Sequence, residues 1–145
     1  MIRILRRTYF SLLLPAVFLI ASLYGLSTWD VIPVPVAKEK AWPILSPCIF
    51  VLSAMTAVAF PIFYRSLFAH RVRDEKSVPE AAWIPFERNQ ILIALATPYF
   101  VLIAYLLGFP RFYFAGTILM ALYAGYYFYP SQRRIGFERR LFRVE

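Results

Sequence analysis

Four stretches of this chain contain no Asp, Glu, Lys or Arg, and they limit the possible folds more than any other feature of the sequence. They cover residues 8–26, 44–64, 90–109 and 112–129. Each is roughly 18–21 residues long, so a helix rising about 1.5 Å per residue would extend over ~27–32 Å, close to the bilayer hydrocarbon thickness of about 30 Å. The sequence therefore predicts four transmembrane helices.

The composition also indicates a membrane protein. The 145 residues are 61% hydrophobic and 17% charged, whereas soluble domains are about 45–50% apolar and about 25% charged. A soluble helical bundle is the alternative, but its helices would show a polar face with a period of about 3.6 residues, which the four stretches lack. We expect an all-α integral membrane fold in one domain, residues 1–145: a four-transmembrane-helix bundle of two antiparallel hairpins with cytoplasmic interfacial amphipathic segments.

The basic residues predict the orientation, because Lys and Arg near the ends of spans are retained on the cytoplasmic side. Of the 16 Lys and Arg residues, only Lys38, Lys40 and Arg111 lie on one side of the predicted spans. We therefore predict a multi-pass protein of the cell inner (plasma) membrane with both termini cytoplasmic. The remaining basic residues lie on the predicted cytoplasmic side: Arg3, Arg6, Arg7, Arg65, Arg71, Arg73, Lys76, Arg88, Arg133, Arg134, Arg139, Arg140 and Arg143.

The first stretch has an alternative interpretation. Residues 8–26 follow a basic start, as the apolar core of a secretory signal peptide does. The stretch is longer than the usual core of about 7–15 residues, and no clear pair of small residues marks a cleavage site. Cleavage would leave three spans with the same sidedness.

The segment between the second and third stretches is expected to be helical at both ends. Apolar residues recur at intervals of three and four from Phe60 onward, which predicts that the second helix continues past the bilayer to about Arg73. Ser77 and Glu80 then have the spacing of a capping box. We expect a short helix to begin there and to stop at Pro85.

The C-terminal tail, residues 131–145, is basic and amphipathic. It places Phe137, Leu141 and Val144 at positions i, i+4 and i+7, among five Arg residues. This pattern predicts a cytoplasmic amphipathic helix that lies on anionic lipid. The alternative is a solvated tail whose charges only fix the topology.

Basic clusters at the cytoplasmic ends of the spans are candidate anion sites. Guanidinium groups pair bidentately with phosphate and carboxylate oxygens, as found on lipid headgroups or a lipophilic substrate. The alternative is that topology alone requires these charges. The candidate anion- and headgroup-binding residues are His70, Arg71, Arg73, Arg133, Arg134, Arg139 and Arg140.

Each predicted span contains one pair of small residues four positions apart, and such pairs allow helix backbones to approach closely. Gly116 and Gly125 are the best candidates for a tight crossing. The predicted helix-packing residues are Ala21, Gly25, Ser53, Ala57, Ala104, Gly108, Gly116, Ala121 and Gly125.

The sequence disfavours several chemistries. One His and one Cys cannot build a zinc site, a disulfide or a bis-His haem site within the chain. We expect no metal, no cofactor and no nucleic-acid partner. Acid–base catalysis would need His70, Glu75, Glu80 or Glu87 to converge with a perturbed pKa, which their spacing does not show.

Transport is constrained by the lack of a carboxylate, Lys or His within the predicted spans, because proton and ion coupling normally uses such groups. A neutral pore lined by Ser53, Thr56, Thr97 and Thr117 stays open as an alternative. Such hydroxyl groups more often bond to the backbone of their own helix or to a neighbouring helix.

These observations favour a small polytopic membrane protein that acts as a non-catalytic accessory or scaffold subunit of a larger membrane assembly. The chain has 14 Phe and 10 Tyr residues, and a protein partner would cover aromatic rings that so small a bundle leaves outward. The expected partners are anionic lipid headgroups and other membrane subunits or further copies of the chain. The alternatives are a membrane-embedded enzyme or binding protein for a lipophilic anionic substrate, and a small transport or channel component.

Overall fold

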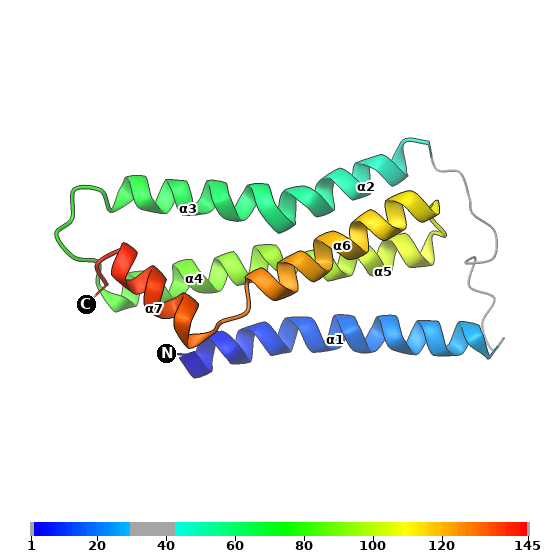
Figure 1. Cartoon of the computed structure of the whole chain (residues 1–145), viewed down its shortest axis with the longest axis horizontal. Coiled ribbons are helices and arrows are strands. Elements are labelled where there is room, and N and C mark those ends of the chain that lie inside the picture. Colours follow the sequence, from blue (N-terminus) through cyan, green and yellow to red (C-terminus); the bar gives the residue numbers. More distant parts are fainter. Residues whose placement is uncertain (1, 30–42, 145) are drawn as a thin grey trace.

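The structure is a computed structural model that describes residues 2–29 and 43–144. Within these residues the chain is all-helical, apart from an isolated bridge between Val78 and Val144 (Figure 1). The described helices are α1 (Ile2–Thr28), α2 (Leu45–Ala54), the π-helical turn η2 (Met55–Ala59), α3 (Phe60–Arg71), α4 (Glu80–Ala94), α5 (Thr97–Leu106), α6 (Arg111–Tyr127) and α7 (Gln132–Leu141).

Three helical segments of the described chain are long and apolar enough to cross a membrane. They are Ile2–Thr28, Leu45–Arg71 and Glu80–Leu106, each of 27 residues. The second joins α2, η2 and α3, and the third joins α4 and α5. These segments support the membrane character predicted from the composition. Since α6 has 17 residues, a fourth span and the double-hairpin arrangement stay predictions.

Prolines explain the two irregular points in the long segments. Pro61 has no N–H to donate to the carbonyl of Ala57, and the π-helical turn η2 ends at Ala59, just before this proline. Pro98 lies in the first turn of α5, where a missing N–H has no helical partner to lose. The α4–α5 junction at Leu95 and Ala96 directly precedes this turn.

The predicted capping box of Ser77 and Glu80 is not formed, because Pro79 is the N-cap of α4 and no side chain caps the helix; the prediction that Pro85 stops this helix is also wrong. Helix α4 starts at Glu80 and continues through Pro85 to Ala94. A proline at this position leaves the carbonyl of Ala81 without its helical donor. Ala81 and Pro85 both lie on the exposed face of α4, where water can bond to that carbonyl, so the helix continues.

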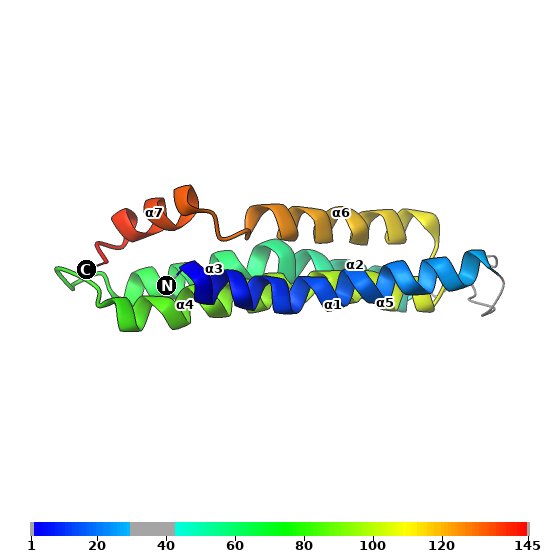
Figure 2. The same ribbon diagram turned by 90° about the horizontal axis from the view of Figure 1, so that it is seen from below.

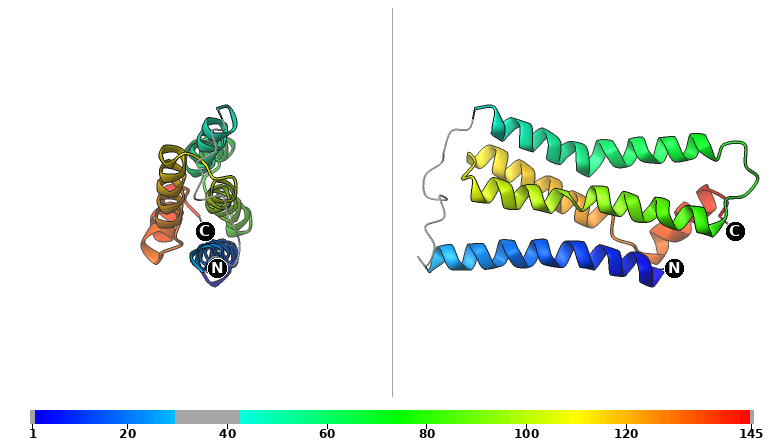
Figure 3. Two further views of the ribbon diagram at one scale, coloured as in Figure 1. Left: turned by 90° about the vertical axis from the view of Figure 1, so that its right-hand side faces the viewer. Right: turned by 180° about the vertical axis from the view of Figure 1, so that it is seen from behind.

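The α4–α5 segment occupies the centre of the bundle. Seen end-on, α1 lies on one side of it, the α2–α3 segment lies on the opposite side, and α6 lies beside it (Figure 3). Figure 2 shows α6 and α7 as a layer above the other helices. As a result, α1 packs mainly on α4 and α5.

One end of the bundle brings together the start of α1, the end of α3, the start of α4 and all of α7 (Figure 1). We call it the arginine-rich end, since these elements carry most of the Arg residues. Phe86 stacks on Phe68 with ring centroids 3.9 Å apart, and Phe142 meets Phe86 edge-on at 5.7 Å. The buried cluster at this end comprises Leu5, Tyr9, Val78, Trp83, Phe86, Ile91, Leu95, Ile135 and Phe142.

Helix α7 packs on this cluster with one face and exposes another. Ile135 and Phe142 are buried, whereas Phe137 and Leu141 are 61% and 51% exposed. The backbone N–H of Val78 also donates to the carbonyl of Arg143 at 3.1 Å. Of the apolar stripe singled out in the sequence, Phe137 and Leu141 therefore lie on the outward face of a docked helix, whereas Val144 packs against the buried cluster. The contact of the outward face with lipid stays a prediction.

Candidate functional site

Two carboxylates are buried at the arginine-rich end of the bundle. Glu87 lies on α4 and is 1% exposed, and Glu138 lies on α7 and is 6% exposed. An ionised carboxylate at such positions is costly unless it is paired and hydrogen-bonded. The partners of these two residues therefore define the most constrained polar site in the described chain.

Each buried carboxylate has an arginine partner on another helix. Arg134 Nη2 of α7 lies 3.1 Å from Oε1 and 3.4 Å from Oε2 of Glu87. Arg65 Nη2 of α3 lies 3.2 Å from Glu138 Oε1. We call Arg65, Glu87, Arg134 and Glu138 the charge network. It connects α7 to α3 and to α4, two elements that are distant from α7 in the sequence.

Local structure places Arg134 against Glu87. The hydroxyl of Ser131 caps α7 by accepting from the Arg134 backbone N–H at 3.2 Å, which fixes the first turn of the helix. The Arg134 guanidinium carbon then lies 5.0 Å from the centre of the Phe128 ring and 6.0 Å from that of Tyr127. These cation–π contacts and the carboxylate hold the guanidinium from two sides.

Polar contacts continue from the charge network into the bundle between α3 and α4. The Gln90 side-chain amide donates to the carbonyl of Pro61 at 3.2 Å. The Asn89 amide donates to the hydroxyl of Tyr64 at 3.1 Å. Both bonds join α3 to α4, so the two helices are held by side-chain amides as well as by apolar packing.

A cavity of about 30 Å³ adjoins the charge network, lined in part by Pro61, Gln90, Arg134 and Glu138. Arg134 Nη1 and Glu138 Oε2 are buried without a hydrogen-bond partner in the described residues. A cavity of this size is large enough for one water molecule, and a donor and an acceptor are the partners that a buried water needs.

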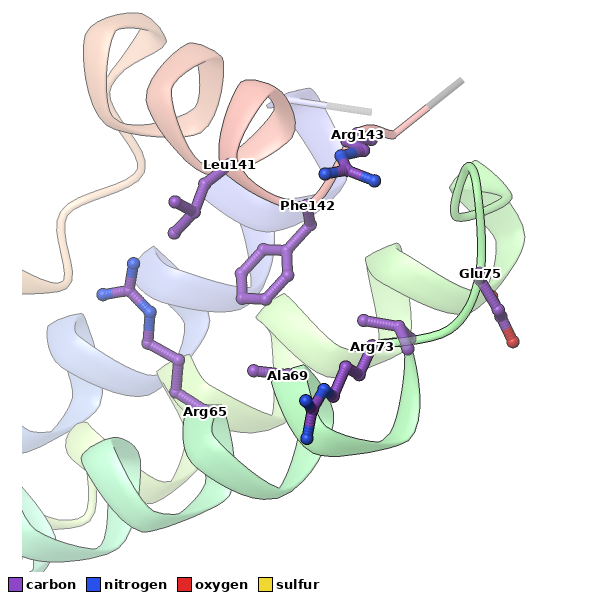
Figure 4. Close-up of a pocket in the computed structure, with 8 residues that line it drawn as sticks. Arg65, Ala69, Arg73, Glu75, Leu141, Phe142 and Arg143 are labelled. Carbon is purple, nitrogen blue, oxygen red and sulfur yellow. The ribbon is translucent and has the colours of Figure 1, made fainter.

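A larger pocket of about 330 Å³ opens on the other side of Arg65 (Figure 4). The Phe142 ring lies at its centre, with the guanidinium groups of three arginines around it. Glu75 also lines the pocket, but its side chain is directed away from Phe142. The full lining is Arg65, Ala69, Val72, Arg73, Glu75, Leu141, Phe142 and Arg143.

The structure separates the candidate anion-binding residues into several groups. Arg73 lines the 330 Å³ pocket, while His70 and Arg71 are exposed on α3 outside it. Arg134 is bound to the buried Glu87, and Arg133 is exposed. The two others, Arg139 and Arg140, line a shallow pocket of about 410 Å³ together with Gly136, Arg143 and Val144.

Sequence reasoning missed Arg65, Glu138 and Arg143 as site residues and considered Glu87 only for catalysis. In the described residues no hydrogen bond or ion pair joins His70 to Glu75, Glu80 or Glu87. A signal for Glu138 existed. It is the single acidic residue among the arginines of α7, and it shares a helix face with Ile135 and Phe142.

The helix-packing residues also separate into groups. Ser53, Ala57 and Ala104 are fully buried, and a Cβ added at Gly116 would lie 2.5 Å from the Phe50 ring. The carbonyl of Gly125 accepts a 2.6 Å bond from the Tyr9 hydroxyl, and Ala121 is half-buried on α6. Gly108 follows α5 with a φ of 61°, a conformation that favours glycine, and there it forms the turn into α6. Ala21 is exposed, and a Cβ at Gly25 would meet no atom within 4 Å.

Three of the four hydroxyl groups of the suggested neutral pore bond to a carbonyl of their own helical segment, whereas the Ser53 hydroxyl is buried without a hydrogen-bond partner in the described residues. The acceptors are the carbonyls of Leu52 and Ser53 for Thr56, of Ala94 for Thr97 and of Tyr113 for Thr117. The Thr56 and Thr97 hydroxyls also lie 3.2 Å apart across η2 and α5. This is the packing role that such groups often have in membrane helices, and it does not favour the transport alternative.

No group of three or more potential metal ligands occurs in residues 2–29 and 43–144. No family model matches the chain, and no curated protein or solved structure matches it significantly.

Proposed function

We propose that this chain is a non-catalytic accessory or scaffold subunit of a larger membrane assembly. It crosses the plasma membrane four times, with α6 as the fourth span, and both termini and α7 are cytoplasmic. The charge network then lies at the inner edge of the bilayer, where α7 closes that end of the bundle. The lateral surface of the bundle is left to contact lipid and partner helices.

The observation that carries this proposal is the exposure of α1. Only 6% of its most apolar 18-residue window is buried within the chain, compared with 50% for Glu80–Leu106. Exposed apolar side chains alone suit a lipid environment, so they do not by themselves indicate a partner.

Small residues on the same helix add a reason to expect a protein partner. Ala21 and Gly25 are one helical turn apart, Ala21 is exposed, and nothing in the described chain lies within 4 Å of a Cβ at Gly25. Small residues let another helix approach closely, which is a main source of helix association in lipid. Gly116, in contrast, is already covered by Phe50 within the chain.

Purification from mild detergent tests the proposal. We expect a defined membrane polypeptide to co-purify at a constant stoichiometry, and Gly25→Leu to remove it because the larger side chain blocks the close approach. The matched control is Ala115→Leu, which enlarges an exposed residue of α6 and should leave the complex intact. If the unsubstituted protein purifies as a stable monomer without a partner, the result contradicts the proposal.

A further inference from the structure

The 330 Å³ pocket at the arginine-rich end has a composition that suits an anion. Arg65, Arg73 and Arg143 line it, and they come from α3, from the segment after α3 and from the residues after α7. Among the described residues, the only carboxylate in the lining belongs to Glu75, which is directed away from the central Phe142 ring (Figure 4). The volume falls within the range of about 300–1,000 Å³ that is usual for small-ligand sites.

Two of the three guanidinium groups have no other polar partner in the part of the chain that the structure describes. In residues 2–29 and 43–144, Arg73 and Arg143 form no ion pair and no side-chain hydrogen bond. Arg65 uses Nη2 for Glu138, and its guanidinium carbon lies 6.0 Å from the centre of the Phe142 ring. A guanidinium has five N–H donors, so one ion pair leaves Arg65 able to bind a second anion.

The backbone at Arg143 gives an independent reason to assign a role to its side chain. Arg143 has a φ of 51° and is the only non-glycine residue with positive φ in the described chain. It follows α7 at the position where the Val144 N–H donates to the Arg139 carbonyl at 2.9 Å. Glycine normally occupies this place in such a helix end, because a Cβ is strained there.

An arginine at a position better suited to glycine indicates a requirement other than folding, as strained residues often do at binding sites. Hydrogen bonds on both sides of Arg143 fix its backbone conformation. The Val144 N–H bonds to the Arg139 carbonyl, and the Arg143 carbonyl accepts from the Val78 N–H at 3.1 Å. The strained backbone therefore holds this side chain at the edge of the pocket.

We propose that Arg65, Arg73 and Arg143 form a binding site for a phosphate group, carried either by an anionic lipid or by a soluble phosphate compound. Guanidinium groups suit phosphate because their planar N–H donors match two phosphate oxygens at once. The apolar wall formed by Ala69, Val72, Leu141 and Phe142 accommodates the non-polar part of the molecule that carries the phosphate.

The key variant is Arg143→Gly, because the two possible roles of Arg143 predict different effects of this substitution on phosphate binding. If the side chain serves only the fold, glycine relieves the strain and no binding changes. If it binds phosphate, Arg143→Gly melts no lower than the starting protein but binds about tenfold more weakly, as expected for the loss of a charge-assisted contact. Arg73→Gln tests the site without altering the helix end and should also weaken binding several-fold. The control is Arg88→Gln, which removes an equal charge from an exposed position on α4 that does not line the pocket.

Two measurements on the full chain separate the sources of the phosphate. In the first, protein in a neutral detergent is exchanged into phosphatidylcholine nanodiscs with and without phosphatidylglycerol, and the retained phosphatidylglycerol is counted by native mass spectrometry. In the second, inorganic pyrophosphate is titrated into the same detergent-solubilised protein by calorimetry. Retention of phosphatidylglycerol alone identifies a lipid headgroup, pyrophosphate binding alone identifies a soluble ligand, and both together identify a site for either.

Absence of binding in both measurements would overturn the proposal. So would an equal loss in Arg88→Gln and Arg143→Gly, because it would show a general effect of charge. The association with partner subunits is measured separately, through Gly25→Leu, so a failure of one proposal leaves the other standing.

Discussion

One nitrogen of Arg134, Nη2, lies within 3.4 Å of both carboxylate oxygens of Glu87, although 47 positions separate the two residues. Glu87 is 1% exposed, so this pair is a buried ion pair. It connects α7 to the central helix of the bundle. Because the Arg134 guanidinium also packs on Phe128, charge and aromatic packing act together to position α7.

We predict that Arg134→Ala destabilises the protein strongly. The substitution leaves the Glu87 carboxylate buried without its counter-charge, a situation that costs about 3–5 kcal/mol in soluble proteins. The free energy of unfolding in mixed detergent micelles measures the effect. Arg133→Ala is the control, since this neighbour is exposed and its removal should change the stability by less than about 0.5 kcal/mol. Equal effects of the two substitutions would contradict a specific role for the buried pair.

Replacing both partners should be less harmful than replacing one. In Arg134→Met/Glu87→Leu no charge is left buried, and apolar side chains of similar volume fill the space. We expect the double variant to be more stable than Arg134→Ala when the same unfolding assay is applied. A double variant as unstable as the single one would show that the pair contributes more than mutual neutralisation.

The two ion pairs of the charge network should respond differently to salt. The Arg65 side chain is 31% exposed, whereas that of Arg134 is 15% exposed. Salt screens exposed charges over a distance of about 10 Å at 0.1 M and about 3 Å at 1 M. Double-mutant cycles at these two salt concentrations should show that the Arg65–Glu138 coupling energy falls and that the Arg134–Glu87 coupling energy changes little. A larger loss of coupling energy for the Arg134–Glu87 pair would contradict the conclusion that this pair is the more buried of the two.

The sequence predicted the long apolar helices well, because the lack of charge over a span is a local property. It predicted their ends less well. Helix α1 begins at Ile2, well before residue 8, since Arg side chains mark the edge of the apolar region without ending a helix. Pro85 misled the prediction for a related reason: whether a helix continues past a proline depends in part on whether the freed carbonyl finds another partner, and this depends on exposure.

The candidate site was largely beyond prediction from the sequence. Which arginine of α7 turns inward depends on the rotation of the helix, and that rotation follows from the Ser131 cap and from the packing of Ile135 and Phe142. The sequence pattern instead emphasised Phe137 and Leu141, which the structure leaves exposed. Pairings such as Glu87 with Arg134 require the relative position of α4 and α7, and no local spacing encodes it.

The contact between Gly116 and Phe50 predicts a size limit at the α2–α6 crossing. A Cβ at position 116 would lie 2.5 Å from Cε2 of Phe50, so Gly116→Ala should destabilise the protein by about 1–3 kcal/mol through overpacking. Gly136→Ala is the control, because nothing lies within 4 Å of its added Cβ, and there alanine should stabilise α7 by up to about 1 kcal/mol. Thermal unfolding in detergent compares the two.

A compensating change tests whether the ring causes the effect. Phe50→Leu removes the ring atoms nearest to Gly116, so Gly116→Ala should cost less in the Phe50→Leu background than in the starting protein. If the cost is unchanged, Phe50 is not the residue that limits the size at position 116.

Fusions to a reporter enzyme test whether α6 is a fourth span, because the activity of the enzyme shows on which side of the membrane each fusion point lies. If α6 crosses the membrane, alkaline phosphatase fused after Val36 or after Pro110 will be active outside, and the same enzyme fused after Lys76 or after Glu145 will be inactive inside. The excess of arginine in the segments that contain Lys76 and Glu145 is the physical reason for this orientation. The decisive comparison is between Pro110 and Glu145, since only α6 and α7 separate them. Equal activity at these two positions would place α6 on the membrane surface and reduce the number of spans to three.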